Sequence, residues 1–297
     1  MTRTTLPLLT LLAAGAHGQV ATPPAAKPWI AMADFQAVRE ATISNAGALE
    51  GTFERRRSGV ELIHEGPNHA LDLELYRYEN RMTGPLAADA TRAYGDTEDF
   101  ILSGFGQTAW GKDAHVQVIG AVEVAGETEA DAADSFRWGL GGAYRWKPGA
   151  QWDVALGLMV QSRFEMAALP IPYVRIHWDP RPDLRIEVRG TGLQNGIYAR
   201  WFATSDKATS VDLACAYETL TFRLTDNAEG PRAVAIGEVP LRIGVTQFLE
   251  PSGTWFARVA YAYNVFHRES FRRDGESIGA FETGGTPVLT VRVGARF

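Results

Sequence analysis

Arginine, histidine and acidic side chains recur at every second residue in several stretches of this sequence, so they would share one face of an extended chain. Two kinds of chemistry use arginine in this way: pairing with carboxylates and recognition of anions. The members of the set are Arg137, Arg145, Arg175, His177, Arg185, Glu187, Arg189, Asp212, Arg242, Arg258 and Arg292.

The sequence offers no arrangement for catalysis or metal binding beside this set. No serine lies in a nucleophile-elbow pattern near any histidine. His64 and His69 flank the turn residues EGPN, where a solvated histidine is the ordinary case, and the acidic stretch 126–135 lacks the glycine and closing glutamate of a calcium loop. We expect no catalytic residue, metal or cofactor, and a hydrolase using His177 or His267 stays an alternative.

The elements that must position the charged set are strands, because each charged row lies opposite an apolar row. Residues 136–147, 152–160 and 254–265 are apolar along one whole face, and weaker copies occur at 69–78, 115–124, 173–179, 183–190 and 240–248. No stretch sustains a helical period. Residues 211–224 alternate too, but the apolar phase changes near Thr219, which predicts a β-bulge or a turn there.

The connections between these strands predict how the sheet closes. Tight turns that contain proline at 147–150, 179–183 and 250–253 alternate broadly with long polar connections at 126–135, 225–238 and 269–285. Short and long connections alternate in this way when a barrel has tight turns on one rim and long loops on the other. We therefore expect an all-β fold: a single antiparallel transmembrane β-barrel of about 12 to 14 strands over residues 48–297.

Two features favour a membrane barrel over a soluble, ligand-binding periplasmic β-sandwich, which stays an alternative. Trp146, Trp152, Trp178 and Trp255 lie beside the tight turns, where an interfacial aromatic girdle belongs. The polar faces also carry many small residues, which suit a curved wall. In a barrel the charged set lines the lumen, where it either braces a narrow interior by ion pairing or selects anions. The cost of an unpaired buried charge favours bracing.

The N-terminus predicts export. Residues 1–18 have a basic start at Arg3, a short apolar run and small residues, as in a secretory signal peptide. Residues 19–47 form a leader rich in proline and alanine, flexible or a first strand, and FQAVREATIS within it could also be a short helix. The formal net charge is −6 with dispersed arginines, which argues against nucleic-acid binding. Cys215 is the only cysteine, so an intramolecular disulfide is excluded.

The predicted C-terminal strand has one apolar face that continues to its last residue. Val291, Val293, Ala295 and Phe297 alternate with polar residues up to the last position. This pattern resembles the C-terminal assembly signal of outer-membrane β-barrels, which implies the barrel-assembly machinery as a partner.

A wider resemblance covers about residues 50–297. LPIPYVRIHWDPRPDLRIEVRG, GIYARWF, VPLRIGVTQFLEPSGTWFARVAYAYNVFHRES and TPVLTVRVGARF are similar to a family of predicted Gram-negative outer-membrane barrels defined as a domain of unknown function. The shared features are Pro172, Arg175 and Trp178 at spacings of three, a tight turn, a second apolar strand and the Arg-Phe ending. The resemblance implies fold and location and carries no catalytic residues.

We therefore expect an exported, porin-like protein of the bacterial outer membrane, in contact with lipid and lipopolysaccharide. It would be non-catalytic, either structural or a narrow channel for small polar or anionic solutes. The alternatives are a barrel enzyme that acts on lipid or lipopolysaccharide, and the soluble periplasmic binding protein. The oligomeric state is left open.

Overall fold

The computed structural model describes residues 28–44, 50–88, 93–164, 166–190, 195–226, 230–250 and 252–297, so the predicted signal peptide at 1–18 lies outside the described residues. Among these residues, no helix is long and apolar enough to cross a membrane. The elements are β1 (Trp29–Ser44), β2 (Thr52–Glu65), β3 (His69–Met82), η1 (Gly84–Ala88), β4 (Thr97–Ala109), β5 (Ala114–Glu127), β6 (Phe136–Gly149), β7 (Trp152–Arg163), β8 (Met166–Arg181), β9 (Leu184–Gly190), β10 (Asn195–Phe202), β11 (Thr209–Arg223), β12 (Ala233–Phe248), β13 (Trp255–Arg273), β14 (Glu276–Thr283) and β15 (Thr286–Arg296).

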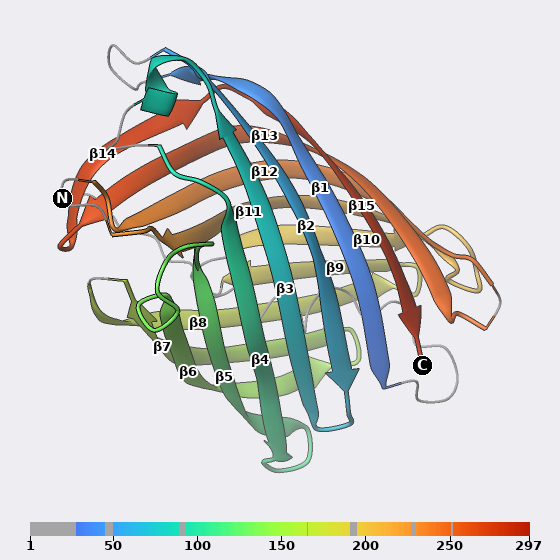
Figure 1. The fold of residues 1–297 in the computed structure, drawn as a ribbon. Coiled ribbons are helices and arrows are strands. Elements are labelled where there is room, and N and C mark those ends of the chain that lie inside the picture. The colour runs from blue at the N-terminus through green and yellow to red at the C-terminus, as the bar shows by residue number, and fades with distance from the viewer. Residues whose placement is uncertain are drawn as a thin grey trace.

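The strands close on themselves into a barrel (Figure 1). From β1 to β13 each strand pairs antiparallel with the next one in the chain. β13 pairs first with β15 and further along with β14, and both of these also pair with β1. β14 and β15 therefore share one position in the wall, so the fifteen described strands form a closed barrel of 14 positions. This confirms the predicted single antiparallel barrel, and 14 lies within the predicted range of about 12 to 14 strands.

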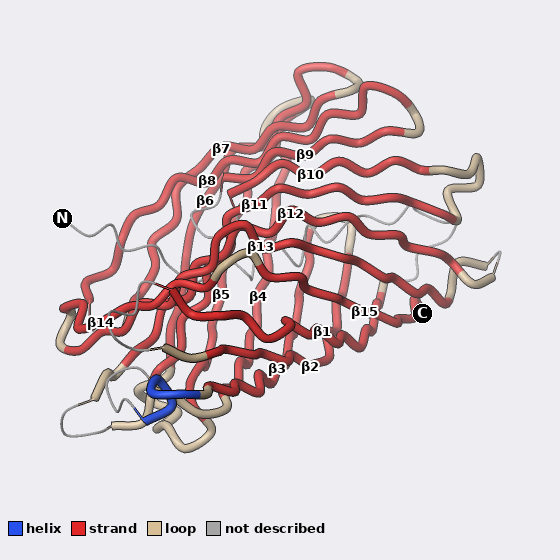
Figure 2. Tube along the Cα trace, turned by 90° about the horizontal axis from the view of Figure 1, so that it is seen from above, coloured by secondary structure: helices blue, strands red, loops and turns tan. Residues whose placement is uncertain are grey.

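The two ends of the barrel differ. Trp29 and Phe297 lie side by side at one end, where each amide donates a hydrogen bond to the other's carbonyl, over 3.1 and 3.0 Å. This terminal end carries the short connections 66–68, 110–113, 150–151, 182–183, 203–208 and 249–254. The opposite loop end carries the longer ones, among them 83–96 with η1, 128–135 and 224–232 (Figure 2).

Side chains alternate between two environments along each strand. In β15, Leu289, Val291 and Val293 face outward and are 38 to 48% exposed, whereas Arg292 and Arg296 face inward and are buried. The outside of the barrel is thus apolar and its inside is rich in charge. This distribution is the reverse of the one in a soluble β-sandwich and is that of an outer-membrane barrel.

Tryptophans gather at the terminal end, beside the turns where the sequence places them. Trp152 and Trp178 stack with ring centroids 5.3 Å apart, and Trp255 at the start of β13 is half exposed. Trp146 lies on the other side of the same β6–β7 hairpin. Rings with an apolar body and a polar N–H suit the boundary between lipid and water.

The barrel narrows at the loop end, where β11 takes the place of β6 beside β5. Gly126 of β5 pairs in parallel with Arg223 of β11. Glu127 fixes this junction, because its carboxylate accepts hydrogen bonds from the amides of Gly95 and Thr225, each over 2.6 Å. The narrowed end is therefore bounded by β1–β5 and β11–β14.

An aromatic cluster, the loop-end plug, fills this narrowed end. Tyr78 packs edge-on against Phe222 with ring centroids 5.1 Å apart, and Phe281 contacts both Phe53 and Phe271. The plug consists of Ile43, Phe53, Tyr76, Tyr78, Tyr94, Ala125, Phe222, Leu224, Val234, Ile236, Phe271 and Phe281. A second apolar cluster fills the interior between β4 and β8; it consists of Ile101, Ile119, Ala121, Ala143, Ala155, Met159, Ile171 and Tyr173.

The prediction of a bulge or a turn near Thr219 is wrong. The register between β11 and β12 is the same on both sides of this residue, as the pairs Cys215–Leu241 and Glu218–Glu238 show. What changes near Thr219 is the environment of the inward side chains and not the course of the backbone. Leu220 and Phe222 face inward because the interior at the loop end is the apolar plug.

All three predicted long connections are partly strand: 126–135 includes only the last two residues of β5. Residues 225–238 include the start of β12, and 269–285 include the end of β13 and all of β14. Asp274 and Gly275, with φ of 50° and 80°, form the two-residue turn between β13 and β14.

The leader contributes to the wall. Of the alternatives left open for residues 19–47, the structure describes a strand from Trp29 to Ser44, so the barrel begins before residue 48. Residues 19–27 lie outside the described part of the chain.

We predict that Gly126→Val destabilises the junction between β5 and β11. A Cβ at Gly126 would lie 2.6 Å from Ser135 Oγ and 3.0 Å from the carbonyl oxygen of Arg223. Such overpacking costs about 1–3 kcal/mol. We expect a lower temperature for loss of the fast-migrating folded form on gels. Gly120→Val on the same strand is the control, because a Cβ there has no neighbour within 4 Å; equal shifts in the two variants would contradict the assignment.

Candidate lumen site

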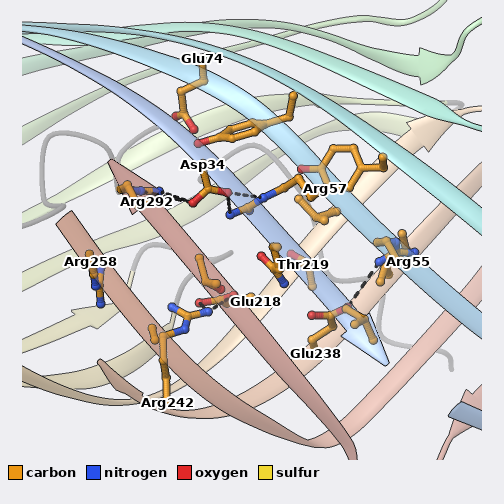
Figure 3. A pocket seen from close by; sticks show the side chains of 18 residues that line it. Asp34, Arg55, Arg57, Glu74, Glu218, Thr219, Glu238, Arg242, Arg258 and Arg292 are labelled. Atoms are coloured by element: carbon orange, nitrogen blue, oxygen red, sulfur yellow. Dashed lines mark hydrogen bonds and ion pairs between the residues drawn. The ribbon is translucent and has the colours of Figure 1, made fainter. Parts of the chain in front are cut away.

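A cavity of about 100 Å³ lies in the lumen against the loop-end plug (Figure 3). Tyr76, Tyr78 and Ile236 of the plug form part of its wall. Half of the lining residues are charged, with five arginines and four carboxylates: Asp34, Arg55, Arg57, Glu74, Glu218, Glu238, Arg242, Arg258 and Arg292. These side chains come from strands on both sides of the closure between β15 and β1.

Asp34 of β1 joins the two strands that flank it. Its Oδ1 accepts a hydrogen bond from Arg57 of β2 over 2.6 Å, and its Oδ2 accepts two from Arg292 of β15, each over 3.2 Å. Arg292 also approaches Glu61 within 3.5 Å. Asp34, Glu61 and Arg292 are buried, with Asp34 5% exposed, whereas Arg57 is half-buried. The last strand is therefore tied to the first two by charge as well as by the main chain.

A second network connects the cavity with the plug. Nδ1 of His267 lies 2.9 Å from Glu238, and its Nε2 lies 3.2 Å from Glu269. Arg55 approaches the same two carboxylates, at 3.4 and 2.7 Å. Tyr94, in the connection between β3 and β4, donates to Glu269 over 2.8 Å, and burial raises the pKa of this phenol well above its ordinary value. A loop-end connection is thus anchored inside the barrel.

A larger cavity of about 340 Å³ lies at the terminal end and holds four members of the charged set, Arg145, Arg175, His177 and Arg185. We call it the vestibule. Its arginines are paired: Arg145 with Asp153, Arg175 with Glu187 and Arg185 with Asp179. His177 Nε2 lies 2.8 Å from Glu187 Oε1, and Arg189 Nε lies 2.9 Å from the same oxygen.

A third cavity, of about 70 Å³, lies between β9 and β13 and holds the rest of the set except Arg137 and Arg292. Asp212 bonds Arg200 over 2.5 Å and lies 3.5 Å from Arg258. Arg242 pairs with Glu218 at 3.2 Å. Arg137 lies elsewhere: it is fully buried at the start of β6, where it contacts Glu123.

The structure thus gives an ion-pair partner to every residue of the charged set. Asp153, Glu187, Asp212 and Glu218 each contact an arginine of the set. Full pairing is the arrangement that braces a narrow interior. The lumen keeps an excess of arginine only locally, around the cavities.

Sequence reasoning missed a row of buried acids on β2 to β5, which consists of Glu61, Asp72, Glu74, Asp99 and Glu123. In the described residues, both carboxylate oxygens of Asp72 and one oxygen of Glu74 have no hydrogen-bond partner. The signal was present: Asp72 and Glu74 alternate with Leu71, Leu73 and Leu75, as inward residues must. Asp34, Arg55 and Arg57 were missed because their strands show weak alternation.

The histidines do not assemble a catalytic site in the described structure. His177 contacts Arg175 and Glu187, and His267 lies between two glutamates, so the partners given to both rings are charged side chains and not a nucleophile. The rings of His64 and His69 stack with centroids 5.2 Å apart. Within the described residues, no group of histidine, cysteine or acidic residues is arranged to hold a metal ion.

Comparison with known proteins finds likeness in fold only. No family model matches the sequence, and no curated protein matches it. An outer membrane channel from Pseudomonas putida F1 is similar in structure at 11% identity, covers 94% of this chain and 98% of its own, and gives a TM-score of 0.48. The toluene transporter TodX of P. putida gives 7% identity, coverage of 94% and 91%, and a TM-score of 0.43.

The translocator domain of the autotransporter NalP from Neisseria meningitidis is also similar, at 12% identity, coverage of 97% and 93%, and a TM-score of 0.40. These values are too low to carry an argument about function. The resemblance to a domain-of-unknown-function family gains no support from a family model. The outer-membrane barrel fold stands on strand pairing and on the apolar outer face.

We predict that Asp34→Ala destabilises the barrel strongly, because it leaves the buried Arg292 and the half-buried Arg57 without their main counter-ion. Breaking a buried pair costs about 3–5 kcal/mol. Urea unfolding in detergent micelles measures the loss. Glu54→Ala, which removes the partner of the exposed Arg56, is the control and should cost less than about 1 kcal/mol. Similar losses for both variants would contradict a bracing role for Asp34.

Proposed function

We propose that this protein is an outer-membrane channel for small polar solutes, with a preference for anions, whose lumen is closed at the loop end in this structure. The observation that carries the proposal is the charged, arginine-lined cavity inside a barrel with an apolar outer face. The predicted signal peptide adds the expectation of export to the bacterial outer membrane.

The route starts at the vestibule of the terminal end, which is the largest of the three cavities. Arg145, Arg175 and Arg185 offer guanidinium groups there, and guanidinium recognises carboxylate and phosphate groups by paired hydrogen bonds. Arg242 and Arg258 line both deeper cavities and continue the same chemistry inward.

The closing element is the loop-end plug, with the network of His267 beneath it. A polar solute cannot pass a cluster of packed aromatic rings, so conduction requires the plug to move. Tyr94 could couple the loops to this movement, because it links the loop-end connection 83–96 to Glu269 inside the barrel by a hydrogen bond. We therefore propose a channel with low basal conductance.

We predict that Phe271→Ala, which shortens a fully buried plug residue, raises the conductance of single channels in planar bilayers. The reversal potential in a KCl gradient should show a preference for chloride. Leu289→Ala on the outward face is the control and should leave conductance at the wild-type level. A correctly folded Phe271→Ala protein without conductance, or one that prefers potassium, would overturn the proposed function.

We propose further that the barrel-assembly machinery recognises the C-terminal strand through Val291, Val293, Ala295 and Phe297. Phe297 projects outward and is 58% exposed, so its ring is available to a partner before membrane insertion. Its main chain is already used in the barrel, because it pairs with Trp29.

We predict that Phe297→Ala slows assembly without changing the stability of the assembled barrel. The substitution removes the ring and keeps the main-chain pairing with Trp29. Pulse-chase labelling should show more unfolded precursor in the periplasm, while the heat stability of the folded fraction stays unchanged. Wild-type assembly kinetics would remove this role from the ring.

A further inference from the structure

A small pocket, which we call the annex, adjoins the vestibule. It has a volume of about 20 Å³ and is lined by residues of β3, β4, β5 and β8. Ala70, Phe105 and Arg175 line both the annex and the vestibule, so the two spaces meet at these residues. A volume of this size holds about one water molecule. The annex therefore has room for one small polar group of a solute that occupies the vestibule.

Asp72 is the acidic group of the annex. It lies in the annex wall and is 3% exposed, and neither of its carboxylate oxygens has a hydrogen-bond partner within the described residues. The charged side chains that act on Asp72 are Glu61, Glu65, Glu74 and Arg292, so acids outnumber bases around it. Arg292 already pairs with Glu61 at 3.5 Å. A buried carboxylate without a counter-ion is costly, so this position favours a cationic donor from a solute.

Arg175 is the basic group of the annex. Its Nε is in use, because it lies 3.0 Å from Glu187 Oε1 and 2.9 Å from His177 Nε2. In the part of the chain that the structure describes, the two terminal nitrogens of Arg175 make no hydrogen bond. A guanidinium with both terminal nitrogens available holds a carboxylate by two parallel hydrogen bonds.

These two opposite charges line one pocket without pairing. No ion pair joins Asp72 and Arg175 in the described structure, although both lie in the annex wall. Ile119 and Tyr173 of the second apolar cluster form another part of that wall. Charged hydrogen bonds are stronger in such surroundings than in water. The annex is thus suited to a solute that carries an ammonium group and a carboxylate and that bridges the two residues.

The vestibule adds a third charge. Arg145 and Arg185 are paired there with aspartates, but Lys147 lines the same space and has no ion pair within the described residues. The vestibule volume of about 340 Å³ leaves room for the rest of a small solute. Lys147 favours a solute with a second negative charge.

We propose that the annex and the vestibule together bind an acidic amino acid. Its ammonium group enters the annex at Asp72, one carboxylate binds the terminal nitrogens of Arg175, and the other carboxylate lies in the vestibule on the side of Lys147. This inference rests on the proposed function, because it names the class of anionic solute that the route would carry.

Isothermal titration calorimetry of the full-length protein in detergent micelles tests the site with L-glutamate and glutarate, which differ only by the ammonium group. We expect the wild-type protein to bind L-glutamate about tenfold more tightly, the effect of a charged hydrogen bond. This comparison needs no substitution. Equal affinities, tighter binding of glutarate or no binding of either acid would overturn the proposal.

Asp72→Asn should bring the two affinities together, because it removes the charge that the ammonium group meets. Asp99→Asn is the matched control: Asp99 belongs to the same row of buried acids and also has an oxygen without a partner in the described structure, but it lines neither space. It should keep the tenfold preference for L-glutamate. An Asp72→Asn protein that shows the heat-dependent gel shift of a folded barrel and still prefers L-glutamate would contradict the assignment.

Lys147→Gln tests the third contact on an exposed side chain, so its folding does not depend on buried charge. We expect severalfold weaker binding of L-glutamate and unchanged binding of L-glutamine, which lacks the second carboxylate. An equal loss for both amino acids would remove Lys147 from the site and refute the preference for an acidic solute.

Conductance separates this site from the proposed function. Chloride-selective conductance of Phe271→Ala together with equal binding of L-glutamate and glutarate would leave the channel and remove the site. Preferential binding of L-glutamate by a protein that does not conduct would leave the site and remove the channel.

Discussion

The wall of this barrel depends on one constraint: within a bilayer every main-chain amide and carbonyl needs a partner inside the protein. Strands satisfy it only when the sheet has no free edge, so the first and the last strand must meet. That closure fixes the alternation of inward and outward side chains all around the barrel. The apolar outer band and the charged interior follow from it, because each strand has one face toward lipid and one toward the lumen.

Placing charged side chains inside the barrel costs desolvation free energy, and ion pairs between strands offset this cost. Asp34, Arg57 and Arg292 come from β1, β2 and β15, so the charges reinforce the closure that the main chain makes. Glu187 serves three basic side chains at once. Side chains that share a carboxylate in this way have little freedom to move. The space for a solute is therefore limited to small cavities. Conduction and stability therefore compete for the same residues.

Much of the fold could be predicted from single strands. Apolar and polar residues alternate in 136–147, 152–160 and 254–265 because one face of each strand meets lipid and the other meets the lumen. This property is local to each strand, so the strand positions and the outward faces could be predicted from it. Register between strands is not local, and the partners of Arg55 or Arg137 could not be read from spacing. Thr219 was misread because an apolar interior and an apolar exterior look alike in a sequence. Asp274-Gly275 carried a hairpin signal that the polar flanks concealed.

The pairing of Trp29 with Phe297 has a consequence for how the chain folds. These residues lie far apart in the sequence, so the wall cannot close until Phe297 is available. Hairpins from β2 to β13 can form between neighbours in sequence, but closure carries the highest contact order in the molecule and its loop-closure entropy. Until then β1 and β15 present open edges that can template association with other chains. The chain therefore needs protection from aggregation mainly during the time before the barrel closes, and less during the pairing of neighbouring strands.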